Sequence, residues 1–387
     1  MHSQSAPDFS SPLSSTTRLQ TVSERELSQH KLHPRFLLKY RVTAELGQGA
    51  TGFVVAARRI EDGRQVAVKF MYKIRIPVTH WLRDRQLGGT VPLEIYILRR
   101  IKHEHIVEFL DCFEDERFFY VVMDGSSFTD PTITSPAATI ATSPGGLLLN
   151  TSTANTTLRQ HTTSPIYRLV NLNQPSPPHK TRTPRRHSRD LFETIHQNPT
   201  LPEPSIHHIF TQICHAVQYL HAHNIVHRDI KDENIVVTDP VSLSVKLIDF
   251  GNAAYVPERE QEWFESFHGT LYCAAPEIVR GERYRGPEQD VWSLGVLLFT
   301  LGFGGRPFGD AREVEAGRWR GRANGEGRSE ALMEVLDMCL TVDVAKRATI
   351  EEVLKSRWVS EGPSGCDRVE VQSHREVEVA EGVQLVE

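Results

Sequence analysis

The chain has 387 residues, 44 Lys and Arg against 49 Asp and Glu, a net charge of −5 and a hydrophobic fraction of 39%. No apolar run reaches the roughly 18–20 residues that span a bilayer, and the N-terminus has no secretory pattern. The charge gives no case for binding nucleic acid or anionic membrane. Five widely spaced cysteines argue against disulfides and zinc ribbons. We therefore expect a folded protein of a reducing compartment, cytoplasmic or nuclear.

Residues 1–39 are rich in Ser, Thr and Gln and bury little apolar surface, so we predict a disordered segment. The pattern changes at residue 40. Apolar runs predict strands over 53–57, 65–71 and 118–123, and apolar positions three to four residues apart predict a helix over 92–101.

A polar, low-complexity stretch covers residues 125–189, which we interpret as an insertion or a linker. The chain beyond it is mainly helical. We predict helices over 190–195, 205–222, 289–301 and 330–340, and short buried strands over 235–237 and 245–248. Residues 360–387 are predicted to form an exposed tail.

This order of elements predicts an α+β fold with two lobes. Strands with one helix come first, and helices follow the polar spacer. The first lobe is expected at 40–124 and the second at 190–359, which makes 40–359 one domain interrupted by the 125–189 insertion.

A glycine-rich turn joins two of the predicted strands. It contains Gly47, Gln48, Gly49 and Gly52 and leads into a further strand rather than a helix. That context excludes a dinucleotide-binding turn and suggests a hairpin flap whose bare backbone can cover phosphates. An ordinary glycine-rich hairpin is the alternative.

A lysine and a glutamate form the next candidate pair. Lys69 ends the apolar run Val66-Ala67-Val68, and Glu94 lies on the helix that follows. If they pair, the ammonium group is held where it can bind the oxygens of two phosphates. Each residue alone could equally be a solvated surface charge.

The densest polar motif is His227-Arg228-Asp229-Ile230-Lys231-Asp232-Glu233-Asn234, between a long helix and an apolar strand. Polar groups in such a place are costly unless they are paired or functional. Asp229 can orient an attacking hydroxyl or accept its proton, Lys231 can add positive charge, and Asn234 offers an amide oxygen to Mg²⁺. His227 is interpreted as a packed, hydrogen-bonded ring, and Arg228 is expected to pair with a carboxylate or a phosphate.

A second carboxylate stands at the end of the strand 245–248. Asp249 is followed by Phe250 and Gly251, and a carboxylate at a strand end is a suitable ligand for Mg²⁺, which prefers oxygen. An ordinary Asp-x-Gly turn is the alternative. That alternative weakens because Asp229, Asn234 and Asp249 occur in the order that phosphoryl transfer requires.

Taken together these residues resemble a eukaryotic-type protein kinase, and the resemblance spans about residues 40–359. In chain order the motifs are Gly47/Gly49/Gly52, Val66-Ala67-Val68-Lys69, His227-Arg228-Asp229 with Asn234, Asp249-Phe250-Gly251, Ala275-Pro276-Glu277, Asp290 to Gly295, and Arg347. Among kinases the sequence is most similar to the PAS-kinase family, near the calcium/calmodulin-dependent group. Only about 39 residues precede the core, so we expect no PAS domain in this sequence.

The resemblance implies ATP and Mg²⁺ as cofactors. Lys69 and Glu94 would act with Asp229 and Lys231 in catalysis, and Asn234 and Asp249 would hold the metal. The remaining nucleotide-binding positions implied are Gly47, Gln48, Gly49, Gly52, Val54, Ala67, Met123 and Asp124. It also implies that Asp290 anchors the catalytic loop and that Arg347 pairs with Glu277.

One departure from the family lies in Gly269-Thr270-Leu271-Tyr272-Cys273. The family usually has its aromatic residue at the position of Cys273, so Tyr272 is displaced by one. The displacement puts the shape of the substrate loop in doubt and leaves the chemistry unaffected.

The resemblance implies a serine/threonine protein kinase that acts on proteins and favours basic residues before the acceptor, read partly by Glu233, and we expect a monomer. Self-phosphorylation is expected at Ser188, in Arg185-Arg186-His187-Ser188, or at Ser266. A non-catalytic pseudokinase scaffold would lack Lys69, Asp229 or Asp249. A small-molecule kinase would lack the Ala-Pro-Glu motif that ends at Glu277.

Overall fold

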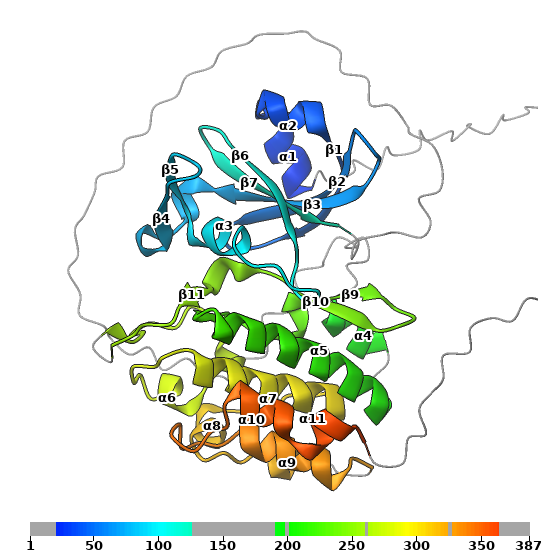
Figure 1. The fold of residues 1–387 in the computed structure, drawn as a ribbon, viewed down its shortest axis with the longest axis vertical. Coiled ribbons are helices and arrows are strands. Elements are labelled where there is room, and N and C mark those ends of the chain that lie inside the picture. Colours follow the sequence, from blue (N-terminus) through cyan, green and yellow to red (C-terminus); the bar gives the residue numbers. More distant parts are fainter. Residues whose placement is uncertain (1–20, 126–189, 198–200, 260–261, 324–326, 364–387) are drawn as a thin grey trace, which may run out of the picture. The chain divides into compact units, whose positions relative to one another are not determined.

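The computed structural model describes residues 21–125, 190–197, 201–259, 262–323 and 327–363. The described residues form two compact units. The N-terminal unit comprises 21–102 and 107–125, and the C-terminal unit comprises 103–106 and the described residues from 190 onward. Figure 1 shows the elements of each unit.

A five-stranded antiparallel sheet forms the centre of the N-terminal unit, in the order β1-β2-β3-β7-β6. Its strands are β1 Tyr40–Gln48, β2 Gly52–Arg59, β3 Gln65–Tyr72, β6 Phe109–Glu114 and β7 Phe118–Asp124. Because successive side chains of a strand point to opposite faces, Val66, Val68 and Phe70 share one face and Lys69 belongs to the other. The strands predicted at 53–57, 65–71 and 118–123 are all present.

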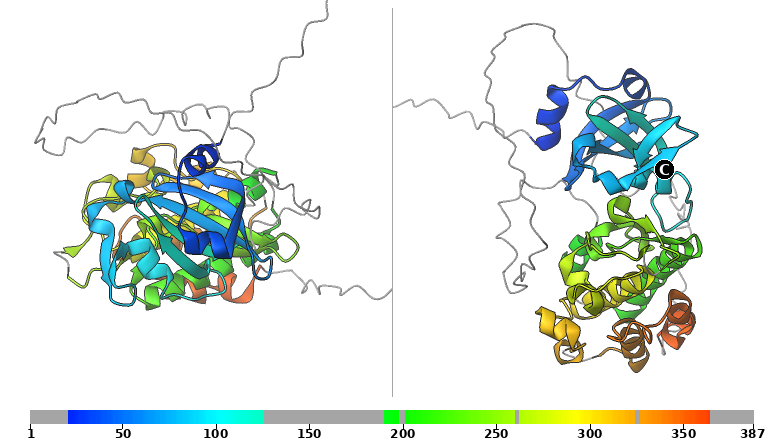
Figure 2. Two further views of the ribbon diagram at one scale, coloured as in Figure 1. Left: turned by 90° about the horizontal axis from the view of Figure 1, so that it is seen from above. Right: turned by 90° about the vertical axis from the view of Figure 1, so that its left-hand side faces the viewer.

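Two short helices, α1 Val22–Ser28 and α2 Pro34–Lys39, pack on the sheet, as Figures 1 and 2 show from two directions. Phe36 of α2 is fully buried in an aromatic cluster with Phe70 and Tyr120. The prediction of disorder over 1–39 is therefore wrong for residues 21–39. A capping box between Thr21 and Glu24 starts α1, and the apolar side chains of the segment were too few to suggest a core contribution. Residues 1–20 lie outside the described residues.

A two-stranded hairpin lies between β3 and the one helix of this unit that was predicted. The segment after β3 forms the 3₁₀ turns η1 Lys73–Arg75 and η2 Val78–His80, and then β4 Trp81–Asp84 and β5 Gly89–Pro92. Helix α3 Leu93–Leu98 follows directly. It is shorter than the predicted 92–101, and the hairpin was not predicted.

The C-terminal unit is mainly helical. Its helices are α4 Leu191–Gln197, α5 Glu203–Ala222, α6 Pro276–Val279, α7 Pro287–Phe303, α8 Ala311–Glu315, α9 Glu330–Cys339, α10 Ile350–Lys355 and α11 Arg357–Glu361. Helix α7 is buried along most of its length and packs against α5 and α9. At Gly295 a side chain would meet Cys339 and Leu340 at under 3 Å, so the close approach of α7 and α9 requires glycine.

Short strands and turns of this unit carry its polar motifs. They are β8 Ile225–Val226, β9 Ile235–Asp239, β10 Ser244–Leu247 and β11 Ala254–Tyr255, with the 3₁₀ turns η4 Asp232–Asn234, η5 Phe250–Asn252, η7 Leu271–Cys273 and η8 Arg320–Arg322. Strand β9 pairs with β10, and β8 with β11. The motifs therefore stand at the ends of short antiparallel ladders.

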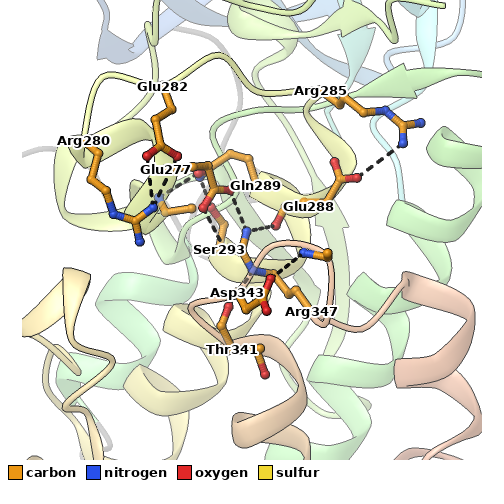
Figure 3. Close-up of polar contacts among 12 residues, drawn as sticks. Glu277, Arg280, Glu282, Arg285, Glu288, Gln289, Ser293, Thr341, Asp343 and Arg347 are labelled. Atoms are coloured by element: carbon orange, nitrogen blue, oxygen red, sulfur yellow. Dashed lines mark hydrogen bonds and ion pairs between the residues drawn. The ribbon is translucent and has the colours of Figure 1, made fainter. Parts of the chain in front are cut away.

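A buried ion pair ties α6 to the loop before α10 (Figure 3). Arg347 donates to both carboxylate oxygens of Glu277, and also to the backbone carbonyls of Thr341 and Glu288. The predicted pair between Glu277 and Arg347 is thus present.

The α+β prediction, with a sheet-containing part followed by a mainly helical part, is confirmed. The described elements reach beyond the predicted domain at two places, because α1 and α2 precede residue 40 and α11 ends at Glu361. Strand β7 ends at Asp124, the predicted end of the first lobe. Residues 126–189 and 364–387, including most of the predicted insertion and tail, lie outside the described residues. No helix within the described ranges has the length and apolar character that a membrane span requires.

Candidate active site

The glycine-rich turn joins β1 and β2, as predicted. Gly49 donates its N–H to the Gly52 carbonyl at 2.8 Å, which closes the turn. A Cβ at Gly52 would lie 1.7 Å from the Phe70 carbonyl oxygen, whereas a Cβ at Gly47 or Gly49 would meet nothing within 4 Å. Gly52 therefore allows β2 to approach β3 closely, whereas Gly47 and Gly49 leave backbone without side chains next to open space.

Lys69 and Glu94 meet in the N-terminal unit. Lys69 Nζ donates to Glu94 Oε1 at 2.7 Å and to Oε2 at 2.9 Å, and both residues are buried. Their meeting follows from the fold, because Lys69 points from β3 to the face opposite α2 while Glu94 lies in the first turn of α3. The predicted ion pair is present.

The strand end at β7 carries the two further residues implied for nucleotide binding. Met123 pairs with Ala67 across β3 and β7, and both are buried. The Asp124 carboxylate accepts from Arg64 Nη2 at 3.0 Å, and the backbone N–H of Asp124 donates to the Glu108 carbonyl.

The carboxylate of Asp229 is the most densely bonded group of the C-terminal unit's candidate site. Its Oδ1 accepts from both the N–H and the hydroxyl of Thr270, at 2.9 and 2.7 Å. Its Oδ2 accepts from the amides of Asn234 at 3.0 Å and Asn252 at 3.5 Å. With 8% of the residue exposed, Asp229 is fixed in one orientation.

Lys231 lies beside Asp229 and is tied to the same threonine. Its Nζ donates to the Thr270 hydroxyl at 2.7 Å and lies 3.6 Å from Asp229 Oδ2 and 3.2 Å from Glu233 Oε2. Burial by itself would lower the pKa of Lys231, but the carboxylates of Asp229 and Glu233 outweigh it and raise that pKa. The ammonium group therefore stays charged.

The two predicted metal ligands differ in their surroundings. Asn234 is buried and donates from Nδ2 to the Asp229 carbonyl and carboxylate, while its Oδ1 accepts no hydrogen bond from the described residues. Asp249 is exposed and has a left-handed backbone, φ +63°, with its Oδ1 accepting from the Gly251 N–H at 3.3 Å. Such a backbone is uncommon outside glycine and recurs at functional sites.

The loop that begins at His227 is anchored by Asp290 of α7, as the resemblance implied. The fully buried Asp290 carboxylate accepts from the backbone N–H groups of His227 and Arg228, at 2.9 and 2.7 Å, and bonds to His221 Nε2 at 3.0 Å. His227 is a packed ring that bonds to the Ile248 carbonyl and contacts Phe250 edge-on, as predicted.

The neighbouring Arg228 does not pair with a carboxylate side chain in the described structure. Its Nε donates to the Asn252 carbonyl at 2.7 Å, and its guanidinium lies 4.3 Å from the centre of the Phe264 ring. Pairing of Arg228 with a carboxylate or a phosphate therefore stays a prediction, since neither partner is found among the described residues.

The displaced aromatic residue is accommodated locally. Tyr272 is partly buried, with the Arg306 guanidinium 3.8 Å from its ring centre, and Cys273 is buried with its carbonyl accepting from Gln289. The candidate acceptor Ser266 is exposed and bonds to His268 at 3.3 Å. The other candidate, Ser188, lies outside the described residues.

Thr270 and Asn252 are site residues for which we predicted no role from the sequence. Both bond to the Asp229 carboxylate, and Thr270 also bonds to Lys231. Only the position of Thr270 after Gly269, inside the quoted substrate-loop motif, offered a signal.

Comparison with known proteins identifies the family of the chain. A protein kinase domain model matches residues 40–132 and 183–359, well over half of the chain. The chain belongs to the protein kinase family. The match covers residues at both ends of the predicted 125–189 insertion and leaves 133–182 unmatched.

Within this family the chain is similar to the mouse PAS domain-containing serine/threonine-protein kinase, with 34% identity over 325 residues, 84% of this chain and 18% of the relative. It is 30% identical to Saccharomyces cerevisiae serine/threonine-protein kinase PSK2 over 342 residues, 88% of this chain and 25% of the relative. Human NUAK family SNF1-like kinase 1 is 27% identical over 360 residues, which cover 91% of this chain and 43% of the relative. The chain thus spans less than half the length of these relatives. The predicted resemblance is confirmed.

Proposed function

We propose that this chain transfers the γ-phosphoryl group of ATP to Ser or Thr hydroxyls of protein substrates in a magnesium-dependent reaction. The observation that carries the proposal is the bonding of Asp229. Its two oxygens accept hydrogen bonds from three residues, Asn234, Asn252 and Thr270, and Lys231 lies 3.6 Å away, which suits a group that must orient an acceptor hydroxyl and take its proton.

The role of Lys231 follows from its charge. It stands beside Asp229 and keeps its proton, so it would stabilise negative charge on the phosphoryl group during transfer. Because Thr270 bonds to both residues, it would fix their separation during the reaction.

The residues proposed as magnesium ligands fit that metal. The exposed Asp249 carboxylate and the Asn234 oxygen are hard ligands, and Mg²⁺ typically takes one or two protein ligands and completes its shell with phosphates and water. Bound magnesium would neutralise charge on the phosphate oxygens.

The nucleotide would be bound by residues of the N-terminal unit. The pairing with Glu94 gives Lys69 a fixed position from which to bind phosphate oxygens, and Gly47, Gln48 and Gly49 offer backbone to cover them. The adenine would contact Ala67 and Met123, two buried residues that pair across β3 and β7 close to the predicted hinge at Asp124. Gly52 and Val54 of β2 would form the rest of the nucleotide-binding surface.

We further propose a preference for basic residues before the acceptor. Glu233 pairs with Lys231 at 3.2 Å through Oε2, but its side chain is 53% exposed, so a substrate arginine can still reach its carboxylate. Self-phosphorylation at Ser188 or Ser266 and a monomeric state belong to the same proposal.

The test is transfer of labelled phosphate from ATP to matched Ser/Thr peptides, with and without arginines before the acceptor. The wild-type protein should label the basic peptide faster and should stop when magnesium is chelated. Asp249→Asn and Lys69→Met should each reduce transfer by at least a hundredfold while the melting temperature changes little. Full activity in both variants would overturn the assigned roles.

A further inference from the structure

Helix α3, which carries Glu94, is too short to hold itself in place. It has six residues, and Pro92 at its N-cap provides no side-chain hydrogen bond. Isolated helices of this length do not persist in water, so tertiary contacts must fix the orientation of α3. The position of Glu94, and with it the Lys69 pair, depends on those contacts.

The β4–β5 hairpin contacts α3 at both ends, and Figure 1 shows it beside the helix. At the N-terminal end the link is covalent, because β5 ends at Pro92 and α3 begins at Leu93. At the C-terminal end it is a side-chain contact. Asp84, the last residue of β4, accepts from Arg99 Nη1 at 2.9 Å and from Arg100 Nη1 at 3.2 Å.

The side-chain contact at the C-terminal end depends on one carboxylate. Asp84 Oδ1 accepts from the N–H groups of Gln86 and Leu87 and so shapes the turn of the hairpin, while Oδ2 binds the two arginines. The Asp84 side chain is fully buried, whereas those of Arg99 and Arg100 are 19% and 34% exposed. The carboxylate is thus enclosed by donors from the turn and from the end of α3.

We infer that Asp84 is a positioning residue for phosphoryl transfer: it fixes the C-terminal end of α3 and thereby the Glu94 carboxylate that holds Lys69. The inference rests on the proposed function. Glu94 and Arg99 are five residues apart, about 7.5 Å along a helix axis, so a tilt of α3 at its C-terminal end displaces Glu94 as well. Displacement by about 1 Å is enough to slow a positioned reaction strongly.

The experiment compares Asp84→Asn with a matched control, Asp62→Asn. Asp62 also lies in a hairpin turn of the N-terminal unit, where it accepts the Arg64 N–H and pairs with the guanidinium of Arg59. Unlike Asp84 it is exposed, and its turn joins β2 to β3 and not to the hairpin before α3. Asp84→Asn should lower kcat/KM for ATP about tenfold with the peptide KM unchanged. The control should match wild type.

Two further measurements separate positioning from general destabilisation. In a Glu94→Gln background, where the pair is already weakened, Asp84→Asn should add less than a twofold loss. Hydrogen–deuterium exchange should speed up in residues 93–98 for Asp84→Asn alone. If Asp84→Asn fails to fold, Arg100→Gln should reproduce the same kinetic pattern at smaller amplitude.

The outcomes are distinguishable. Equal kcat/KM for Asp84→Asn and the control, or an undiminished loss in the Glu94→Gln background, overturns the inference. A wild-type protein that transfers no phosphate overturns the proposed function instead. In that case, faster exchange in α3 for Asp84→Asn would still support its coupling to the hairpin, and unchanged exchange would overturn that too.

Discussion

Arg347 donates to the two carboxylate oxygens of Glu277 at 2.7 and 2.8 Å, although the residues are 70 positions apart. The two side chains are 0% and 5% exposed. Removing one partner of such a pair leaves a buried charge without compensation. The pair is therefore a sensitive point in the stability of the C-terminal unit.

Arg347→Ala should lower the free energy of unfolding by about 3–5 kcal/mol. The control is Arg285→Ala, which removes a half-exposed arginine 3.6 Å from Glu288. This variant should change the free energy of unfolding by less than about 1 kcal/mol. Urea unfolding of both variants checks the prediction, which a small effect of Arg347→Ala would contradict.

Phe36→Ala should destabilise the N-terminal unit by about 3–5 kcal/mol, because the ring is fully buried in the aromatic cluster. Leu38, two residues later on α2, is 77% exposed, so Leu38→Ala should stay within about 0.5 kcal/mol of wild type. Thermal melting distinguishes the two. Equal melting temperatures would mean that α2 does not contribute to the folded core.

The two glycine positions of the turn should respond differently to alanine. Gly52→Ala forces a Cβ against the Phe70 carbonyl and should lower the free energy of unfolding by about 1–3 kcal/mol or more. Gly49→Ala meets open space and should melt like wild type. Denaturant unfolding measures both. A neutral Gly52→Ala variant would show that β2 and β3 can separate without penalty.

Stability should depend on pH through Asp115. Burial by itself would raise the pKa of this carboxyl, but its hydrogen bonds with His30, Tyr120 and backbone N–H groups outweigh burial and lower that pKa below 3.8. A group with a lowered folded-state pKa stabilises the fold above its unfolded-state pKa, and this contribution is lost as the pH falls through the folded-state value.

Asp115→Asn should therefore lower the free energy of unfolding by about 1–2 kcal/mol at pH 7. The difference from wild type should stay constant down to about pH 5 and shrink below about pH 4. Urea titrations at pH 7, 5 and 3 give the comparison. A difference that grows on acidification would have the wrong sign for this carboxylate.

From the sequence we could predict those parts of the fold and site whose residues lie in one short motif or follow a regular apolar spacing. Asp229, Asn234 and Lys231 lie in one contiguous motif, so their meeting requires only a local turn. Lys69 and Glu94 were found through the apolar run before the lysine and the helical spacing after it. Apolar periodicity located the long helices within a few residues.

Other features depend on contacts that no local pattern encodes. Phe36 stands among polar residues, and only the aromatic cluster formed by distant strands makes its helix part of the core. The hairpin before α3 is held by Asp84, whose partners Arg99 and Arg100 resemble surface charges in the sequence. Whether Lys69 and Asp229 face one nucleotide stays a prediction.

The bonds from Asp290 also bear on the order in which the protein becomes competent during its synthesis. Arg228 has a left-handed backbone, φ +63°, and its N–H and that of His227 are held by a carboxylate made some sixty residues later. A nascent chain that ends after Asp249 but before α7 contains Lys69, Asp229 and Asp249 and lacks the support for this turn. Premature termination between residues 250 and 289 should therefore yield a polypeptide with all three of these side chains and no organised loop around Asp229.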